Sequence, residues 1–431
     1  MRLRANPGLF GLLALTLVAT AACGGGTPQG HHAASAKAPS FELALVRGGD
    51  LYLVTRSGGT PRRLTHGLQA SYPLFSPDGR YIAFVDATGQ GSPDELGTVG
   101  IDGHGLTLFG GLLPASQGAF AWNPKQDVLA VWGAGLWTAV PGGKPQALAE
   151  ISGRVDSFAW APDGTGYAYT VLPPYTAPPL PSDVLYVARD GDAPSVRLRA
   201  QNGNGLLLAG YWPNGQGLLY WEDPLHSASL AADGLSLLSL SLANGGPRTL
   251  ATTLPYPSWV QPLGSQSVIT VAGQGRTAWT EKSLVACALA QATCGAIEAQ
   301  GGAVALDPAG SAGSRSIAWI TAKDLSPMSP GTPSVLAAWN AGRALYAATL
   351  GRGAQPKVKV ASGDVFDPAW NAAGTELLYV QGGWVKLFRW GRGSVRLARI
   401  SSAKAPPQGY YGFASWSSTF AWYPGAPASA K

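Results

Sequence analysis

Histidine is the side chain most able to move a proton near neutral pH, and the strand-rich part of this sequence contains three. His66 follows Leu64-Thr65 of an expected strand and His104 lies in a Gly-rich turn, so a repeat in the sequence accounts for both. Only His226 falls in an irregular loop. HExxH, CxxC, G-x-S-x-G and phosphate-binding glycine motifs are missing from the sequence. We therefore predict no catalysis, no cofactor and no metal site, with carboxylates at a channel mouth as the alternative catalytic arrangement.

Two cysteines of the same region have a spacing that suits a disulfide. Cys287 and Cys294 flank the segment ALAQAT, and a hairpin there would bring them close together. A disulfide would agree with export from the cytoplasm. We predict that these two residues are bridged.

The elements that position such residues form a repeat. An aromatic or apolar residue is followed by a short turn with Pro, Asp or Gly and then by a hydrophobic strand, most clearly at 75–85 and 160–169. Looser copies begin at Trp122, Trp212, Leu306 and Trp370, and the weakest begin at Val260 and Trp416. The spacing centres on about four dozen residues, the size of one four-stranded propeller blade.

A second repeat lies between these copies: a strand, a Gly-rich turn and a further short strand. Gly with Asp or Asn supplies the positive φ that a tight hairpin requires. Counting the hairpin that holds the two cysteines, eight such units match eight copies of the first repeat. The sequence therefore predicts an all-β fold, a single β-propeller of four-stranded antiparallel blades, with eight blades favoured and seven as the alternative.

The segment Leu64-Thr65 followed by SYPLFSPDGRYIAFV resembles the repeat of TolB-type propellers, which are WD40-like but lack the Trp-Asp signature. The resemblance covers roughly residues 41–424. It implies that Asp78 and Asp163 lie in turns between the first two strands of a blade, and that Trp122, Trp160 and Trp370 pack between blades. Some peptidases carry a similar propeller, and we expect this chain to differ from them because its sequence shows no hydrolase domain.

The N-terminal segment has the features of an export signal. Arg2 and Arg4 precede an apolar run from Gly8 to Ala22, which is too short for a settled membrane span. Thr20-Ala21-Ala22-Cys23-Gly24 resembles a bacterial lipobox, which implies a signal peptide over 1–22 and acylation of Cys23, with palmitate among such acyl groups. Residues 23–40 then read as a flexible tether and residues 425–431 as a C-terminal tail.

These features predict a lipoprotein of the bacterial cell envelope, extracytoplasmic and held at the membrane by its lipid anchor alone. Loss of Arg2 and Arg4 with the signal peptide lowers the formal net charge from +6 to +4. Such a modest charge without a dense basic groove argues against nucleic acid as a partner. We expect a monomer whose partners are envelope proteins or a wall polymer.

Long insertions fall between the second and third strands of five expected blades, and antiparallel topology would place all five on one face. Loops that grow on one side of a rigid scaffold are common binding sites. The residues predicted to contact a partner on this loop face are Tyr175, Trp279, Met328, Asp94, Glu95, Glu222, Asp223, His226 and Asp324. The predicted function is a docking module without a reaction of its own. The alternatives are a glycan or small-molecule receptor using the central funnel, and a hydrolase or lyase with carboxylates at the channel mouth.

Overall fold

The computed structural model describes residues 42–423 except 56–58, 88–93, 111–118, 190, 228–233, 244, 299–300, 327–331, 352–355, 408 and 410. These residues belong to one compact unit, Ala38–Lys431. Cys23 and Met328, which carry predictions, lie outside the described residues.

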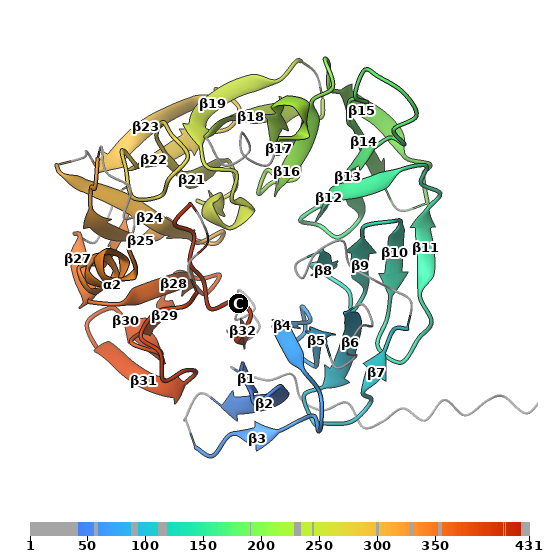
Figure 1. Ribbon diagram of the computed structural model, residues 1–431. Coiled ribbons are helices and arrows are strands. Elements are labelled where there is room, and N and C mark those ends of the chain that lie inside the picture. Colours follow the sequence, from blue (N-terminus) through green and yellow to red (C-terminus); the bar gives the residue numbers. More distant parts are fainter. Residues whose placement is uncertain are drawn as a thin grey trace, which may run out of the picture. The chain divides into compact units, whose positions relative to one another are not determined.

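The strands form six four-stranded antiparallel sheets and one eight-stranded sheet. The large sheet consists of two four-stranded groups that are joined by one pair, Thr253 with Ala272. The structure thus has eight groups of four strands, which follow one another around a ring (Figure 1). The predicted β-propeller with eight blades is confirmed.

Each blade runs from an innermost to an outermost strand. In that order, the first four blades are β32 (Phe420–Tyr423), β1 (Glu42–Arg47), β2 (Asp50–Thr55), β3 (Arg62–Arg63); β4 (Ala70–Phe75), β5 (Tyr81–Asp86), β6 (Glu95–Gly100), β7 (Thr107–Leu108); β8 (Phe120–Trp122), β9 (Leu129–Trp132), β10 (Leu136–Ala139), β11 (Gln146–Ala149); and β12 (Arg154–Trp160), β13 (Gly166–Leu172), β14 (Val184–Arg189), β15 (Ser195–Arg199).

The remaining blades continue in the same order. They are β16 (Gly205–Tyr211), β17 (Gly217–Asp223), β18 (Leu235–Ser241), β19 (Arg248–Thr253); β20 (Gln261–Pro262), β21 (Ser267–Ala272), β22 (Ser283–Ala288), β23 (Thr293–Glu298); β24 (Ala303–Gly310), β25 (Ser316–Lys323), β26 (Ala344–Thr349), β27 (Val358–Ser362); and β28 (Val365–Trp370), β29 (Glu376–Gln381), β30 (Trp384–Arg389), β31 (Gly393–Arg399). The short helices are η1 (Pro224–His226), η2 (Pro257–Trp259) and α2 (Pro333–Ala341).

The first blade is completed by the last strand of the chain. β32 pairs antiparallel with β1, and Glu42 lies opposite Tyr423. Both ends of the described chain therefore contribute to one blade, because β32 is the innermost strand of the blade that β1 to β3 continue.

The repeated Trp residues link neighbouring blades, as the resemblance implied. The Trp122 indole N–H donates to the Leu74 carbonyl oxygen of the preceding blade at 3.0 Å, and Trp160 donates to Ala121 at 3.2 Å. Trp370 is buried in the core that the sixth, seventh and eighth blades share. Asp78 and Asp163 lie in the turns between the first two strands of their blades, where each accepts a backbone N–H two residues further on.

All five long insertions join the second strand of a blade to its third, as predicted. They connect β5 to β6, β13 to β14, β17 to β18, β21 to β22 and β25 to β26. The last of them contains α2, whose N-cap Thr332 side chain accepts the Val335 N–H. We call this side of the ring the loop face, and the side with the short Gly turns the turn face.

The segment between β31 and β32 packs against the core that the sixth, seventh and eighth blades share. Trp416 N donates to Asp367 Oδ2 at 2.7 Å, and Ala278 N donates to the Tyr411 carbonyl oxygen at 2.9 Å. The Phe413 ring lies 4.7 Å from that of Tyr256. In Figure 1 this red segment runs across to the yellow strands before it returns to β32.

Two further features bear on the predictions. A disulfide joins Cys287 of β22 to Cys294 of β23, which are paired directly across the hairpin. In the part of the chain that the structure describes, no helix is both long and apolar enough to cross a membrane.

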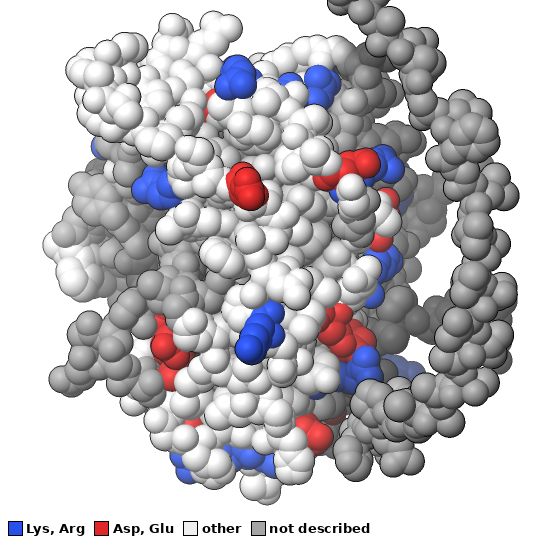
Figure 2. Space-filling view, turned by 90° about the vertical axis from the view of Figure 1, so that its right-hand side faces the viewer, with Lys and Arg blue, Asp and Glu red and all other residues white. Residues whose placement is uncertain are grey.

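Figure 2, which views the right-hand side of the ring in Figure 1, shows Lys, Arg, Asp and Glu interspersed on a largely uncharged surface.

Candidate functional site

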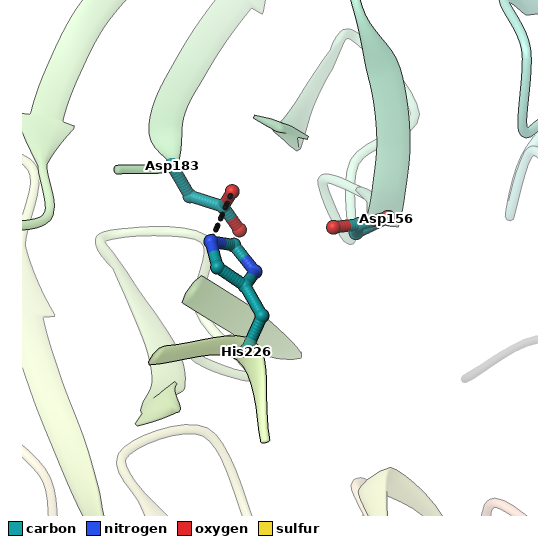
Figure 3. Close-up of side chains that lie close together, drawn as sticks. All are labelled: Asp156, Asp183 and His226. Atoms are coloured by element: carbon teal, nitrogen blue, oxygen red, sulfur yellow. Dashed lines mark ion pairs between the residues drawn. The ribbon is translucent and has the colours of Figure 1, made fainter. Parts of the chain in front are cut away.

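Two carboxylates and a histidine come together on the loop face, between the fourth and fifth blades. Asp156 lies in β12, Asp183 directly precedes β14, and His226 ends η1 just after β17. One potential ligand atom from each residue lies within 4.8 Å of the other two. Figure 3 shows Asp183 pointing at the His226 ring, with Asp156 on the other side. We call these three residues the Asp–Asp–His site.

Backbone contacts between the two blades hold Asp183 in place. Its N–H donates to the Asn204 carbonyl oxygen at 3.0 Å, and its Oδ2 accepts the Leu206 N–H at 2.8 Å. The residue is 0 % exposed, and its Oδ1 has no hydrogen-bond partner. A buried carboxylate oxygen without a partner is costly, so this oxygen is a candidate for contact with a further group at the site.

The backbone at His226 is unusual. Leu225 and His226 have φ values of 54° and 51°, in the left-handed region that non-glycine residues seldom adopt. The Asn204 side chain holds this turn, because its Oδ1 accepts the Leu225 N–H at 3.2 Å while its Nδ2 donates to Glu222. The turn projects the imidazole back toward Asp183.

The contacts of the imidazole determine which ring nitrogen carries the proton and which can accept one. Nε2 lies 3.2 Å from the Pro181 carbonyl oxygen, which can only accept a hydrogen bond. Nε2 therefore carries the proton in this arrangement, and the lone pair is on Nδ1. Asp183 Oδ1, 3.7 Å from Nε2, faces the protonated side of the ring. In Figure 3 the other ring nitrogen lies on the side of Asp156.

Gly205, the first residue of β16, makes room for the ring. A Cβ at this position would lie 2.8 Å from His226 Nδ1 and 3.1 Å from Cε1. Both distances are shorter than ordinary van der Waals contact. Only glycine therefore permits this approach of strand and imidazole.

Burial is the main influence on the pKa values of the carboxyl groups at the site. Burial raises the pKa of Asp183 to about 6; the charge of Asp156 adds to the rise, whereas the Leu206 N–H and His226 oppose it. Burial also raises the pKa of the adjacent Asp223. Asp156 pairs with Arg154, with its Oδ1 2.6 Å from Arg154 Nε. The site thus combines a carboxyl that exchanges its proton near neutral pH with one that pairs with a cation.

The structure separates most residues of the predicted partner-binding set. Tyr175 is 58 % exposed, in the loop between β13 and β14. Asp94 and Glu95 are half-buried at the start of β6. Asp324 accepts the backbone N–H groups of Glu281 and Ser326, so it fixes two loops to each other.

Two residues of that set require correction. Trp279 is only 5 % exposed, because the segment before β32 covers it: a Cβ on Gly412 would lie 2.6 Å from its ring. It also packs edge-on against Trp339. Asp223 is buried as well, with Ser227 N donating to it. Neither residue offers a side chain to a macromolecular partner.

His226 was singled out from the sequence, but Asp156 and Asp183 were not. Asp183 follows a Pro-rich loop and Asp156 lies in a strand, and neither position distinguishes them from other Asp residues. The weak signal was the irregularity of the loop that holds His226.

A second polar cluster is enclosed by the seventh and eighth blades and the segment before β32. Arg343 is buried, with its guanidinium over the rings of Trp339 and Phe366 and its Nη1 3.8 Å from Asp307 Oδ2. Burial raises the pKa of Asp307 to about 7 and that of Asp367 to about 6. Because the segment before β32 covers it, this cluster supports the fold rather than a reaction.

A large groove lies on the turn face. Its volume is about 1010 Å³, and its polar lining includes Arg189, Asn214, Gln216 and Arg248. It therefore opens on the opposite side of the ring from the Asp–Asp–His site. The two features do not form one pocket.

Comparison with known proteins finds similarity at the level of structure alone. No protein-family model and no curated protein sequence matches the chain. One similar solved structure comes from a study of two prolyl endopeptidases: it has 11 % identity and a TM-score of 0.44, over 84 % of this chain and 50 % of that one. Another is prolyl oligopeptidase B from Galerina marginata, with 10 % identity and a TM-score of 0.45, over 78 % of this chain and 51 % of that one. The chain spans about half the length of these structures.

These comparisons correct the predicted function. The chain was expected to be a docking module and not an enzyme, whereas the similar solved structures are hydrolases. That prediction is withdrawn. Because identity and TM-score are both low, the similarity assigns no activity or substrate, and the choice of site rests on the side chains of this chain.

Proposed function

We propose that the protein is a hydrolase or lyase whose reaction centre is the Asp–Asp–His site. The observation that carries this proposal is the meeting of Asp156, Asp183 and His226 within 4.8 Å. A positioned histidine and carboxylates are the groups with which enzymes transfer protons.

Each residue has a distinct part. His226 Nδ1 supplies the lone pair with which the site acts on a water molecule or on an acidic substrate proton. The Pro181 carbonyl oxygen orients the ring by accepting from its protonated nitrogen, and Asp183 Oδ1 lies 3.7 Å from the same nitrogen, too far for a hydrogen bond. Asp156 bounds the space on the Nδ1 side, and Arg154 neutralises part of its charge.

The nearest hydroxyl on β12 is already engaged. Ser157 Oγ lies 2.7 Å from Thr170 Oγ1 and accepts the Leu208 N–H at 3.0 Å. A serine nucleophile is therefore not part of the proposal. Water attack or proton abstraction remains, which is chemistry of hydrolases and lyases respectively.

A panel of chromogenic esters, aminoacyl anilides, glycosides and uronide polymers tests the proposal. His226→Gln should lower any turnover by about 100-fold or more, since general acid–base groups contribute 10²–10⁴-fold. His104→Gln is the matched control, because His104 lies in a turn on the opposite face. Turnover equal in wild type and His226→Gln, or no turnover of any panel substrate, would overturn the proposal.

We also propose that the chain is a TolB-type propeller and a bacterial lipoprotein on the extracytoplasmic side of a membrane. The support is the Ser-Pro-Asp-Gly repeat and the lipobox-like segment that ends at Cys23. Its substrate would then be an envelope protein or a wall polymer. Radiolabelled palmitate should enter the wild type and not Cys23→Ser when both are produced in bacteria; equal labelling would contradict the anchor.

A further inference from the structure

We propose that the Asp–Asp–His site binds one divalent transition-metal ion of the Zn²⁺ or Mn²⁺ type. This inference rests on the proposed reaction centre and names its cofactor. Asp156, Asp183 and His226 each offer one ligand atom within 4.8 Å of the others. Metal–ligand bonds of about 2.0–2.2 Å would bring the three atoms onto one ion after small side-chain shifts.

The donor set indicates the class of ion. Two carboxylates and a neutral imidazole carry two negative charges, which match a divalent cation. Imidazole favours Zn²⁺ and other transition metals, whereas Ca²⁺ and Mg²⁺ prefer shells made of oxygen. The combination therefore points away from Ca²⁺ and Mg²⁺.

An independent observation is the unsatisfied oxygen of Asp183. The residue is 0 % exposed, and Oδ1 makes no hydrogen bond although it faces the site. The distance of 3.7 Å from Oδ1 to His226 Nε2 is too long for a hydrogen bond. A bound cation would supply the partner that this oxygen lacks.

The atoms that face one another indicate which of them would bind the ion. His226 Nε2 lies 3.7 Å from Asp183 Oδ1, so these two atoms would be ligands, and the ring would carry its proton on Nδ1 when the ion is bound. The Leu206 N–H holds Asp183 Oδ2, as hydrogen-bond donors around metal sites hold ligating carboxylates. Asp223, buried nearby with Oδ1 unpartnered, adds negative charge to the surroundings.

The ion would change the part that His226 plays. A ring nitrogen bound to the cation would no longer take up a proton, and the metal would instead polarise a water or a substrate oxygen. Arg154 competes with the cation for Asp156, with 2.6 Å between the paired atoms. Removing this arginine should therefore strengthen metal binding.

Isothermal titration of the metal-stripped protein tests the inference, with ZnCl₂ and MnCl₂ as ligands and CaCl₂ and MgCl₂ as comparison salts. His31→Gln and His32→Gln are introduced first, because adjacent histidines in the N-terminal segment could bind Zn²⁺ themselves. We expect one equivalent of Zn²⁺ or Mn²⁺ to bind. Loss of outer-shell partners costs 10–100-fold in metal affinity, so loss of a ligand in Asp183→Asn or His226→Gln should cost about 100-fold or more.

Three further variants make the test specific. Asp156→Asn removes a less buried ligand and should weaken binding if Asp183→Asn fails to fold. Arg154→Ala should tighten binding several-fold, and Asp102→Asn, exposed on the turn face, should leave it unchanged. Absence of stoichiometric binding, or affinity unaltered by both Asp156→Asn and Asp183→Asn, would overturn the inference.

The two proposals fail in different ways. Turnover that persists after metal removal and is lost in His226→Gln would support the proposed hydrolase or lyase and overturn the metal centre. Stoichiometric binding that depends on Asp183, without turnover of any panel substrate, would leave the metal centre and overturn the proposed reaction.

Discussion

The position of the His226 imidazole depends on the absence of a side chain at position 205. His226 can lie beside β16 because Gly205 has no Cβ, and a Cβ there would come within 2.8 Å of Nδ1. The left-handed turn at Leu225 and His226 provides the other half of this placement. Local backbone strain and a close approach therefore coincide at the residue to which we assign the reaction.

Gly205→Ala should lower turnover and Zn²⁺ affinity by about 10- to 100-fold, because misplacing a catalytic group by about an ångström has effects of this size. Enzyme assay and titration calorimetry would measure the change. Gly295→Ala is the matched control, since a Cβ on this strand residue would meet no atom within 4 Å. Equal losses in both variants would mean that β-strand stability, and not the imidazole, is affected.

Also at the scale of residues, the Arg343 cluster makes stability depend on pH. Burial raises the pKa of Asp307 from 3.8 to about 7. Between these values the native protein retains a proton that the unfolded chain releases, so stability falls as pH rises from about 4 to about 7. Asp307→Asn lacks this contribution, and asparagine tolerates the φ of 43° at this position.

The expected result is a smaller loss of stability in Asp307→Asn than in the wild type between pH 5 and pH 7.5. Urea unfolding midpoints at several pH values would measure it. Asp102→Asn, which changes an exposed carboxylate, should follow the wild-type profile. Parallel profiles for the wild type and Asp307→Asn would show that Asp307 releases its proton in the native state at ordinary pH.

At the scale of elements, each blade is a meander whose hairpins are set by local sequence. The hairpin of β22 and β23 is additionally closed by the disulfide between Cys287 and Cys294, across a sequence separation of 7. Such a short loop limits the entropy that the bond removes from the unfolded chain. The hairpin is therefore held mainly by its strand pairing.

Replacing both cysteines by alanine should destabilise the protein by about 2–3 kcal/mol and lower the melting temperature by about 3 °C. Differential scanning calorimetry of the oxidised wild type and the double variant would measure the shift. Adding reductant should lower the wild type to the same temperature and leave the variant unchanged. If reductant also lowered the melting temperature of the variant, the response of the wild type to reductant could not be assigned to this disulfide.

At the scale of the whole molecule, ring closure joins the two ends of the described chain. β32 contributes the innermost strand of the first blade, with Phe420 and Tyr423 buried. Tyr423 also reaches the second blade, where its ring lies 5.9 Å from that of Phe75. One short strand thus connects the last part of the chain to the first two blades.

Truncation before Phe420 should therefore open the ring. Losing each buried aromatic side chain costs about 3–5 kcal/mol, and the exposed edge of β1 would favour self-association. Thermal melting should show a fall of several degrees, and size-exclusion chromatography should show oligomers. Truncation after Tyr423 is the control and should preserve both properties; identical behaviour of the two truncated chains would mean that β32 is not required for closure.

Much of the architecture was predictable from the sequence because its signals are local. Alternating apolar residues and Gly turns specify a hairpin within a few residues, so eight blades and the five long insertions on the loop face could be predicted. The pairing of Cys287 with Cys294 follows from the same hairpin geometry. His226 was identified because it interrupts an otherwise regular repeat.

The tertiary structure decided everything that depends on how blades meet. Asp156 and Asp183 come from the fourth blade and His226 from the fifth, so only the stacking of these blades brings them together. Trp279 looked available in its loop, but the segment before β32, remote in sequence, buries it. Strand periodicity records which residues face a neighbour, and it holds no information about which distant residue that neighbour supplies.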